Sequence, residues 1–146
     1  AGALYPVEVF VGRFSETAGG RWKPGLYHLL PVSRTLGLLR SFDSEPPVPG
    51  LYYPATFGHP VFSFVFVVNL EKAVFKYRYR GYRHALMEAG AIAQQIDLAV
   101  RCHGMGTRSW SGFSDDPVRR DIGLDRVGYL PVLIQCCGFG GGEEAA

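Results

Sequence analysis

The sequence lacks the features that define three large classes of protein: a cysteine framework, a membrane-spanning segment and a strong net charge. Its cysteines number only three, so they do not form the even disulfide scaffold of a small secreted domain. No stretch reaches the ~18 consecutive apolar residues of a membrane span. The net charge of +2 is too small to indicate a nucleic-acid or membrane-surface protein. We therefore expect a cytoplasmic protein that binds neither nucleic acid nor membrane.

A metal site is not indicated either. Cys102-His103 and the pair Cys136-Cys137 lack the CxxC or HxxxH spacing that is typical of zinc ligands. Adjacent cysteines on a strand point to opposite sides, which excludes a bond between them. We interpret the cysteines as buried thiols and expect no metal.

What the sequence does contain is enough apolar material for one compact domain, with 47% hydrophobic residues in a chain of 146. Alternating or continuous apolar runs predict strands, and apolar residues at helical spacing predict helices. Because these elements mix without regular βαβ alternation, we expect an α+β fold. The predicted strands are 7–13, 25–30, 61–68 and 129–137, and the predicted helices are 33–40, 82–102 and a brief one from Asp115.

The helix predicted at 82–102 is the clearest element. Its apolar stripe is unusually rich in alanine, as at Ala85, Ala89 and Ala93, with Gly90 beside it. Small side chains allow another backbone to approach closely, so we expect this helix at the centre of the fold or at a subunit interface. The proline-rich segment 41–59 is predicted to be a long loop that shapes a substrate pocket.

A cluster of basic and aromatic residues, KYRYRGYR at 76–83, immediately precedes that helix. It is compatible with a solvated basic face, with a nucleic-acid patch, or with an anion site. The nucleic-acid interpretation is the weakest, because nothing else in the chain extends the patch. The anion site is supported by position: Arg80 and Arg83 fall near a helix N-terminus, where free N–H groups also favour a phosphate or carboxylate.

A second candidate for ligand binding is the segment 104–113, GMGTRSWSGF, whose glycines would let backbone N–H groups approach a planar ligand. Turns use the same residues, so this pattern alone is weak. It follows a helix rather than a strand, and so it is not a dinucleotide-binding fingerprint.

Three segments in order resemble the nitroreductase family, and within it the SagB-type dehydrogenases that oxidise azolines in modified peptides. AGALYPVEVFV at 1–11 is similar to SAGALYP-x-E-x-Y of that family. KYRYRGYRHALMEAGAIAQQIDLAV at 76–100 resembles KYxxRxYRxALxEAGHxAQNLxLxA. GMGTRSWSGFSDDPVRRDIGL at 104–124 resembles GLGxxxxGGFDDxxxxxLLGL. The resemblance covers nearly the whole chain.

This resemblance implies a nitroreductase-like fold: a mostly antiparallel central sheet, a long central helix and flanking helices. It places that domain at residues 1–140, followed by a flexible tail at 141–146. It also implies that an N-terminal part, which carries phosphate-binding residues in the family, is missing here, and that a partner segment would supply it. FMN is the expected cofactor and a homodimer the expected assembly.

The resemblance also assigns roles to individual residues. Lys76 and Tyr77 match the pair that the azoline oxidases use for proton abstraction. Arg80 and Arg83 stay candidates for anion binding. Backbone N–H groups of Ser111 and Gly112 would face the reactive edge of the flavin. The residues expected to line the flavin are Ala1, Gly2, Ala3 and Leu4.

The implied activity is oxidation of an azoline or similar small-molecule or peptide substrate by hydride transfer to flavin. Two alternatives stay open. One is a nitro- or quinone reductase that uses NAD(P)H, and the other is a flavin-free scaffold subunit of a peptide-modifying complex.

Overall fold

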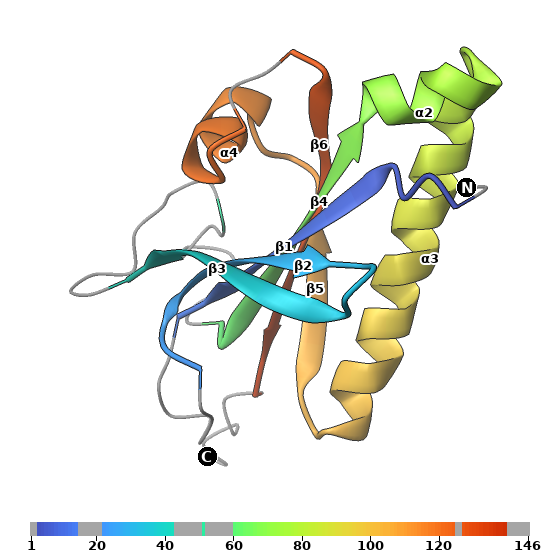
Figure 1. The fold of residues 1–146 in the computed structure, drawn as a ribbon. Helices are drawn as coiled ribbons and strands as arrows, with labels where there is room; N and C mark the ends of the chain where they lie inside the picture. Colours follow the sequence, from blue (N-terminus) through green and yellow to red (C-terminus); the bar gives the residue numbers. More distant parts are fainter. Residues whose placement is uncertain (1–2, 15–21, 43–50, 52–59, 125–126, 140–146) are drawn as a thin grey trace.

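The computed structural model describes residues 3–14, 22–42, 51, 60–124 and 127–139, which form an α+β fold as predicted (Figure 1). The predicted tail, residues 1–2 and most of the segment 41–59 lie outside the described residues. The strands are β1 Val7–Arg13, β2 Gly25–Leu30, β3 Thr35–Ser41, β4 Phe62–Asn69, β5 Gly106–Trp110 and β6 Tyr129–Gly138. The helices are α2 Leu70–Tyr77, α3 Arg80–Cys102 and α4 Asp115–Asp121.

The six described strands form one sheet in the order β3-β2-β1-β4-β6-β5, and every neighbouring pair is antiparallel. β4 lies inside the sheet between β1 and β6, and its residues Val65 to Val68 are fully buried. An apolar run without alternation is typical of such a strand, because both of its faces are covered. The predicted strands β1, β2, β4 and β6 are all confirmed.

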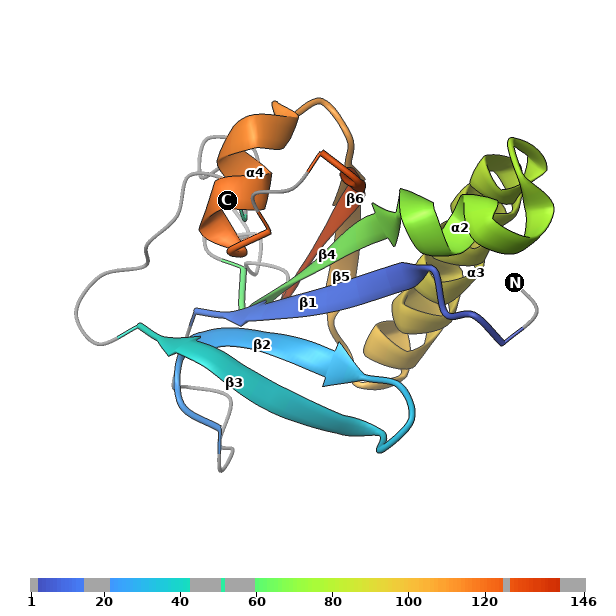
Figure 2. The ribbon, with the colours of Figure 1, turned by 45° about the horizontal axis from the view of Figure 1, so that its top comes forward.

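Helices cover the two faces of the sheet. α2 and α3 pack on one face, where α3 contributes the buried residues Ala85, Ala89 and Ala93. α4 packs on the other face and contributes Val118 to a separate cluster (Figures 1 and 2). The alanine stripe therefore does bring α3 close to the centre of the sheet, as predicted.

The prediction of a helix at 33–40 is wrong, because most of this segment belongs to strand β3. Leu30 and Arg34 are joined by a backbone hydrogen bond of 2.8 Å across a turn, in which Arg34 has a φ of 56°. The turn reverses the chain, so that Thr35–Ser41 pairs with Gly25–Leu30 of β2. The helix was predicted because Pro31 and Ser33 are suited to a helix start, but Gly37 weakens a helix there and pairing with β2 favours the strand.

Two further elements were not predicted. α2 begins directly after β4, capped by Asn69, whose side chain accepts a hydrogen bond from the Lys72 amide at 3.1 Å. β5 was read as a connection, yet it is the edge strand that pairs with β6. Both elements are short, and a short element gives a weak periodic signal.

The α3 helix and the hairpin that it forms with α2 depend on two glycines. A Cβ on Gly81 would lie 1.8 Å from the carbonyl oxygen of Ala73, so the two helices contact backbone to backbone there. Gly104 follows the end of α3 with a φ of 74°, the left-handed conformation expected of a residue that ends a helix. Among the described helices, none is long and apolar enough to cross a membrane.

Candidate functional site

The predicted catalytic pair lies at the end of α2. Lys76 is exposed and Tyr77 is half-buried. The Lys76 Nζ lies 5.4 Å from the centroid of the Tyr77 ring, a cation–π contact. The edge of the Tyr77 ring meets His84 of α3, with ring centroids 5.1 Å apart. The tyrosine is therefore held on two sides, while the lysine amine faces outward.

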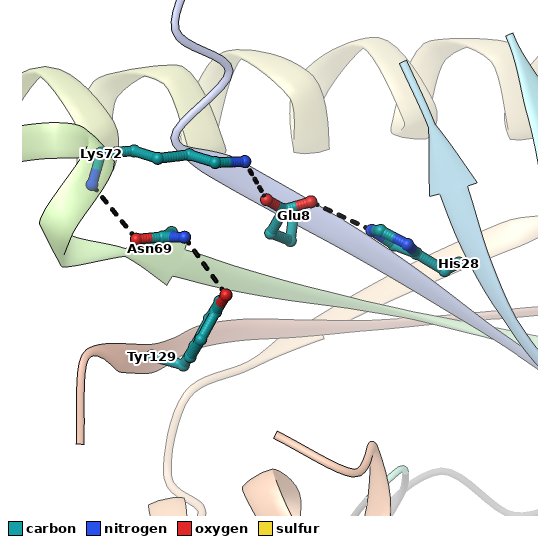
Figure 3. A network of polar contacts seen from close by, with 5 residues as sticks. All are labelled: Glu8, His28, Asn69, Lys72 and Tyr129. Carbon is teal, nitrogen blue, oxygen red and sulfur yellow. Dashed lines mark hydrogen bonds and ion pairs between the residues drawn. The ribbon is translucent and has the colours of Figure 1, made fainter. Parts of the chain in front are cut away.

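A polar network fixes the start of α2, one turn before Lys76 (Figure 3). The Lys72 amine donates to the Glu8 carboxylate at 2.5 Å, and the same carboxylate meets the His28 Nε2 at 3.0 Å. The Asn69 cap donates its amide to the Tyr129 hydroxyl at 3.3 Å. Glu8 thereby ties α2 to β1 and β2 and supports the position of the predicted catalytic pair.

Glu8 is a residue that the sequence reasoning missed as part of the site. It stands in the first motif, where the family pattern also has a glutamate, and this was the available signal. Its side chain is only 13% exposed, and a largely covered carboxylate needs hydrogen-bond or charged partners. The motif position is thus explained by the contacts with Lys72 and His28.

The N-terminal motif runs beside the same end of the molecule. The backbone N–H of Asn69 donates to the carbonyl of Pro6 at 2.8 Å, which aligns this segment with the junction of β4 and α2. Ala3 is exposed with a φ of 60°, and Leu4 is half-buried. Ala1 and Gly2 lie outside the described residues. Strained left-handed backbone at a non-glycine residue is common at functional sites.

Arg80 and Arg83 occupy the predicted position at the beginning of α3. Arg80 is the first residue of the helix, and both side chains are exposed. The first turn contains no acidic residue, and Tyr79 provides no side-chain cap. The N-terminus of α3 therefore combines the positive end of the helix dipole with two exposed guanidinium groups, and this arrangement favours an anion.

Ser111 and Gly112 lie in another part of the chain from Lys76 and Tyr77, directly after the edge strand β5. Both are exposed. A Cβ on Gly112 would lie 3.0 Å from the Trp110 Nε1, so the indole leaves little room for a side chain there. Trp110 in turn meets Phe113 edge to face, with centroids 5.6 Å apart. No hydrogen bond or ion pair among the described residues joins Ser111 or Gly112 to the α2–α3 hairpin.

Two concave regions lie on the α3 face of the sheet. An apolar groove of about 770 Å³ runs between β1, β2, β4 and the second half of α3, and includes Val11, Tyr27, Phe64 and Ile96. A smaller pocket of about 400 Å³ lies between α3, β5 and β6 and has polar groups on its walls, among them Gln135. Each is large enough to hold a small molecule.

Comparison with known proteins identifies the family. Residues 33–139 match the model of the nitroreductase family. The chain belongs to the nitroreductase family. This assignment confirms the resemblance on which the site residues were chosen, and it supports an oxidoreductase.

The microcin B17-processing protein McbC of Escherichia coli is 38% identical over 145 residues. This match covers 94% of the present chain and 52% of McbC, so the chain spans about half the length of that relative. A nitroreductase-related protein of Methanocaldococcus jannaschii is 27% identical over 142 residues, with 94% and 67% covered.

Solved structures agree with this assignment. The E. coli microcin synthetase McbBCD complex with truncated pro-MccB17 bound gives a TM-score of 0.81 at 37% identity, covering 96% of this chain and 54% of the matched one. A nitroreductase-related protein of Ralstonia eutropha gives a TM-score of 0.73 at 22% identity, with 93% and 59% covered, and shows the fold alone. The nitroreductase-like fold is confirmed.

Proposed function

We propose that this chain forms the core of an FMN-dependent dehydrogenase of the SagB type, which oxidises an azoline or a similar group in a peptide. The observation that carries this proposal is the Lys76-Tyr77 pair at the end of α2, anchored through Lys72 to Glu8 of the first motif. The chain is 38% identical to a protein that processes microcin B17, and this similarity supports a peptide substrate.

The residues present are suited to the ring side of a flavin. Ser111 and Gly112 follow an edge strand in exposed positions, where their backbone N–H groups are accessible to a planar ring. The contact of Gly112 with the Trp110 indole explains why this position has no side chain. Arg80 and Arg83 at the helix terminus are suited to the phosphate. When bound, FMN would supply the acceptor for a hydride from the substrate carbon.

The protein side chains would then handle the proton. The Lys76 amine is exposed beside the Tyr77 ring, so either group can reach a substrate that approaches the end of α2. The contact with His84 restricts the Tyr77 ring, which keeps the pair in one arrangement. Donors at Ser111 and Gly112 would stabilise the negative charge that develops on the ring.

A homodimer is part of the proposal. The α2–α3 hairpin exposes several large apolar side chains, and exposed apolar surface can mark an interface. These residues include Phe75, Tyr79, Tyr82, Leu86, Met87 and Leu98. The small residues Gly90 and Ala91 between them would allow the α3 helix of a second copy to approach closely.

An absorption spectrum of the purified protein tests the cofactor. We expect the visible absorption bands of bound flavin, either as purified or after FMN is added. A protein that stays colourless with FMN and acts only with partners would establish the scaffold alternative instead. Turnover that depends on NAD(P)H with nitro or quinone substrates would establish the reductase alternative.

Substitution of Lys76 tests the catalytic role. With a thiazoline-containing peptide, Lys76→Ala should lower kcat by about 100-fold or more, because a positioned general base contributes that much. The FMN spectrum should stay unchanged. Lys23→Ala, which removes another exposed lysine outside the site, is the matched control and should keep full activity. An unchanged kcat in Lys76→Ala would overturn the assigned role.

A further inference from the structure

The packing of α3 leaves apolar side chains of β2 and β3 open on the same face of the sheet. α3 packs on β1, β4, β5 and β6, whereas β2 and β3 form the end of the sheet farthest from β5 (Figure 2). Tyr27 and Leu29 of β2 pair with Leu38 and Leu36 of β3, so these four side chains share one face. Leu38 is 51% exposed, and the other three line the apolar groove. The apolar surface therefore continues from the groove onto the edge strand β3.

This open surface has the width of one helix. Neighbouring strands lie about 4.8 Å apart, so β1, β2 and β3 together span about 10 Å from the first strand to the third. An α-helix with its side chains is about 10–12 Å across. On the far side of the groove, Ile96 and Val100 of α3 form the opposite wall. A second helix that lay beside α3 would fill the groove and cover this end of the sheet.

The charges around this surface are of one sign. Residues 22–42 contain Lys23, Arg34 and Arg40 and no acidic residue. Arg34 is exposed at the turn between β2 and β3 and lines the groove, and no described residue of the groove wall carries a carboxylate. Arg40 donates instead to the backbone carbonyl of Asp121. An acidic side chain near Arg34 would therefore be attracted, and a basic one would be repelled.

We propose that the groove and the adjoining face of β2–β3 dock an amphipathic helix of a partner polypeptide. Its apolar side chains, at i, i+3, i+4 and i+7, enter the groove, and a carboxylate faces Arg34. A small ligand would leave Leu38 uncovered. The helices of a second copy that expose apolar residues, α2 and α3, carry Lys76, Arg80 and Arg83 and would bring like charge toward Arg34. The proposal does not depend on FMN.

The two methionines of the chain report on binding at separate places. Met105 lines the groove, whereas Met87 is 62% exposed on the α2–α3 hairpin. Two short helical peptides serve as probes, both with leucines at i, i+3, i+4 and i+7; the other positions are alanine and glutamate in one, and alanine and lysine in the other. In NMR titrations of protein with isotope-labelled methionine methyl groups, the acidic peptide should shift the Met105 signal and leave Met87 unchanged. It should bind about fivefold to tenfold more tightly than the basic peptide.

Two variants separate the contribution of charge from that of apolar contact. Arg34→Glu should abolish the preference for the acidic peptide. Arg120→Glu is the matched control and should keep the preference, because Arg120 is an exposed arginine of α4 on the other face of the sheet. Leu36→Ala should weaken both peptides alike, by about threefold to tenfold, because apolar contact in the groove is lost.

Binding of neither peptide, equal binding of the two, or a shift of Met87 alone would overturn the proposal. Two other occupants would also overturn it. Decanoate that shifts Met105 where the peptides do not would identify a site for a small amphipathic acid, and a Met105 signal that moves with protein concentration alone would identify a second copy. Flavin spectra of the same samples keep this result separate from the proposed function, because either kind of binding can be present without the other.

Discussion

The helices on the two faces of the sheet contribute side chains of different size. On the α4 face, α4 contributes Val118, which packs with Phe10, Leu26 and Ile134 of the sheet. On the α3 face, α3 contributes Ala85 and Ala89, which meet Phe66 and valines of β1 and β4. Small side chains on α3 allow the helix backbone to lie close to the sheet.

The difference in packing matches a difference in where the concave regions and the candidate site residues lie. Both of the concave regions described above lie on the α3 face, and the predicted catalytic pair belongs to the hairpin that covers it. A stripe of alanines leaves space at the flanks of α3, where the two concave regions lie. We therefore interpret the α4 face as the structural core and the α3 face as the functional one.

Thiol labelling gives the largest expected contrast. Burial raises the pKa of Cys136, on the α4 face, and of Cys137, on the α3 face, to about 12 in both cases. Since the thiolate is the reactive form, both should react with iodoacetamide at pH 8 about a thousandfold more slowly than an ordinary cysteine. Cys102 is exposed at the end of α3 and should react at once.

Mass spectrometry of the labelled protein checks this expectation. One equivalent should add quickly, and two more only slowly while the protein stays folded. The reaction should speed up as the pH rises toward 12, because the thiolate fraction grows. If the α3 face opens more readily, Cys137 will react before Cys136, and equal rates would contradict a difference between the two faces.

Truncation in the cluster on the α4 face should reduce stability the most. Ile134 is fully buried on the α4 face, and Ile134→Ala should lower the free energy of unfolding by about 2–5 kcal/mol, through lost apolar contact and the cavity left behind. Val32→Ala, at a position 86% exposed, should change it by less than about 0.5 kcal/mol. Urea unfolding measures both, and similar values for the two variants would refute close packing on the α4 face.

A larger side chain at the α2–α3 contact should lower the free energy of unfolding by less than Ile134→Ala does, and through a steric clash rather than a cavity. In Gly81→Ala the new Cβ meets the Ala73 carbonyl, so α2 and α3 must separate, and we expect a loss of about 1–3 kcal/mol. Flavin binding or activity should fall with it, because α2 carries Lys76. Gly90→Ala is the control for contacts within the chain: nothing in this chain lies within 4 Å of its Cβ, and in the monomer a helical alanine should stabilise by about 0.5–1 kcal/mol.

The outcome for these two glycines decides whether the close contact is real. If Gly81→Ala proves as stable as Gly90→Ala, the two helices do not touch at Ala73. The hairpin would then lack the rigidity on which the position of Lys76 depends.

The predictable part of the fold follows from long or strongly patterned segments. The unbroken apolar run of β4 and the alanine stripe of α3 were each recognised, because their burial is written directly in their residues. The segment 35–41 was misread, since its leucines are compatible with either period and only pairing with β2 distinguishes them. α2 and β5 were missed because neither is long enough to show a period.

The candidate site also has a part that could be predicted from the sequence and a part that could not. Lys76, Tyr77, Ser111 and Gly112 were chosen from ordered motifs, and the family they point to is confirmed. Glu8 was visible in a motif, but its role was not, because its partners Lys72 and His28 are distant in the chain. Whether the chosen residues bind FMN and move a proton stays a prediction.

The sequence by itself therefore determined the class of fold and the central helix, through periodicity, and the family, through the resemblance of three ordered motifs. The tertiary structure alone decided which distant residues meet: Glu8 with Lys72, Ala73 with Gly81, and Asp97 with Thr107. The physical reason is that hydrogen bonds and steric contacts act over a few ångströms of space, and pattern along the chain does not specify which residues will come within that distance.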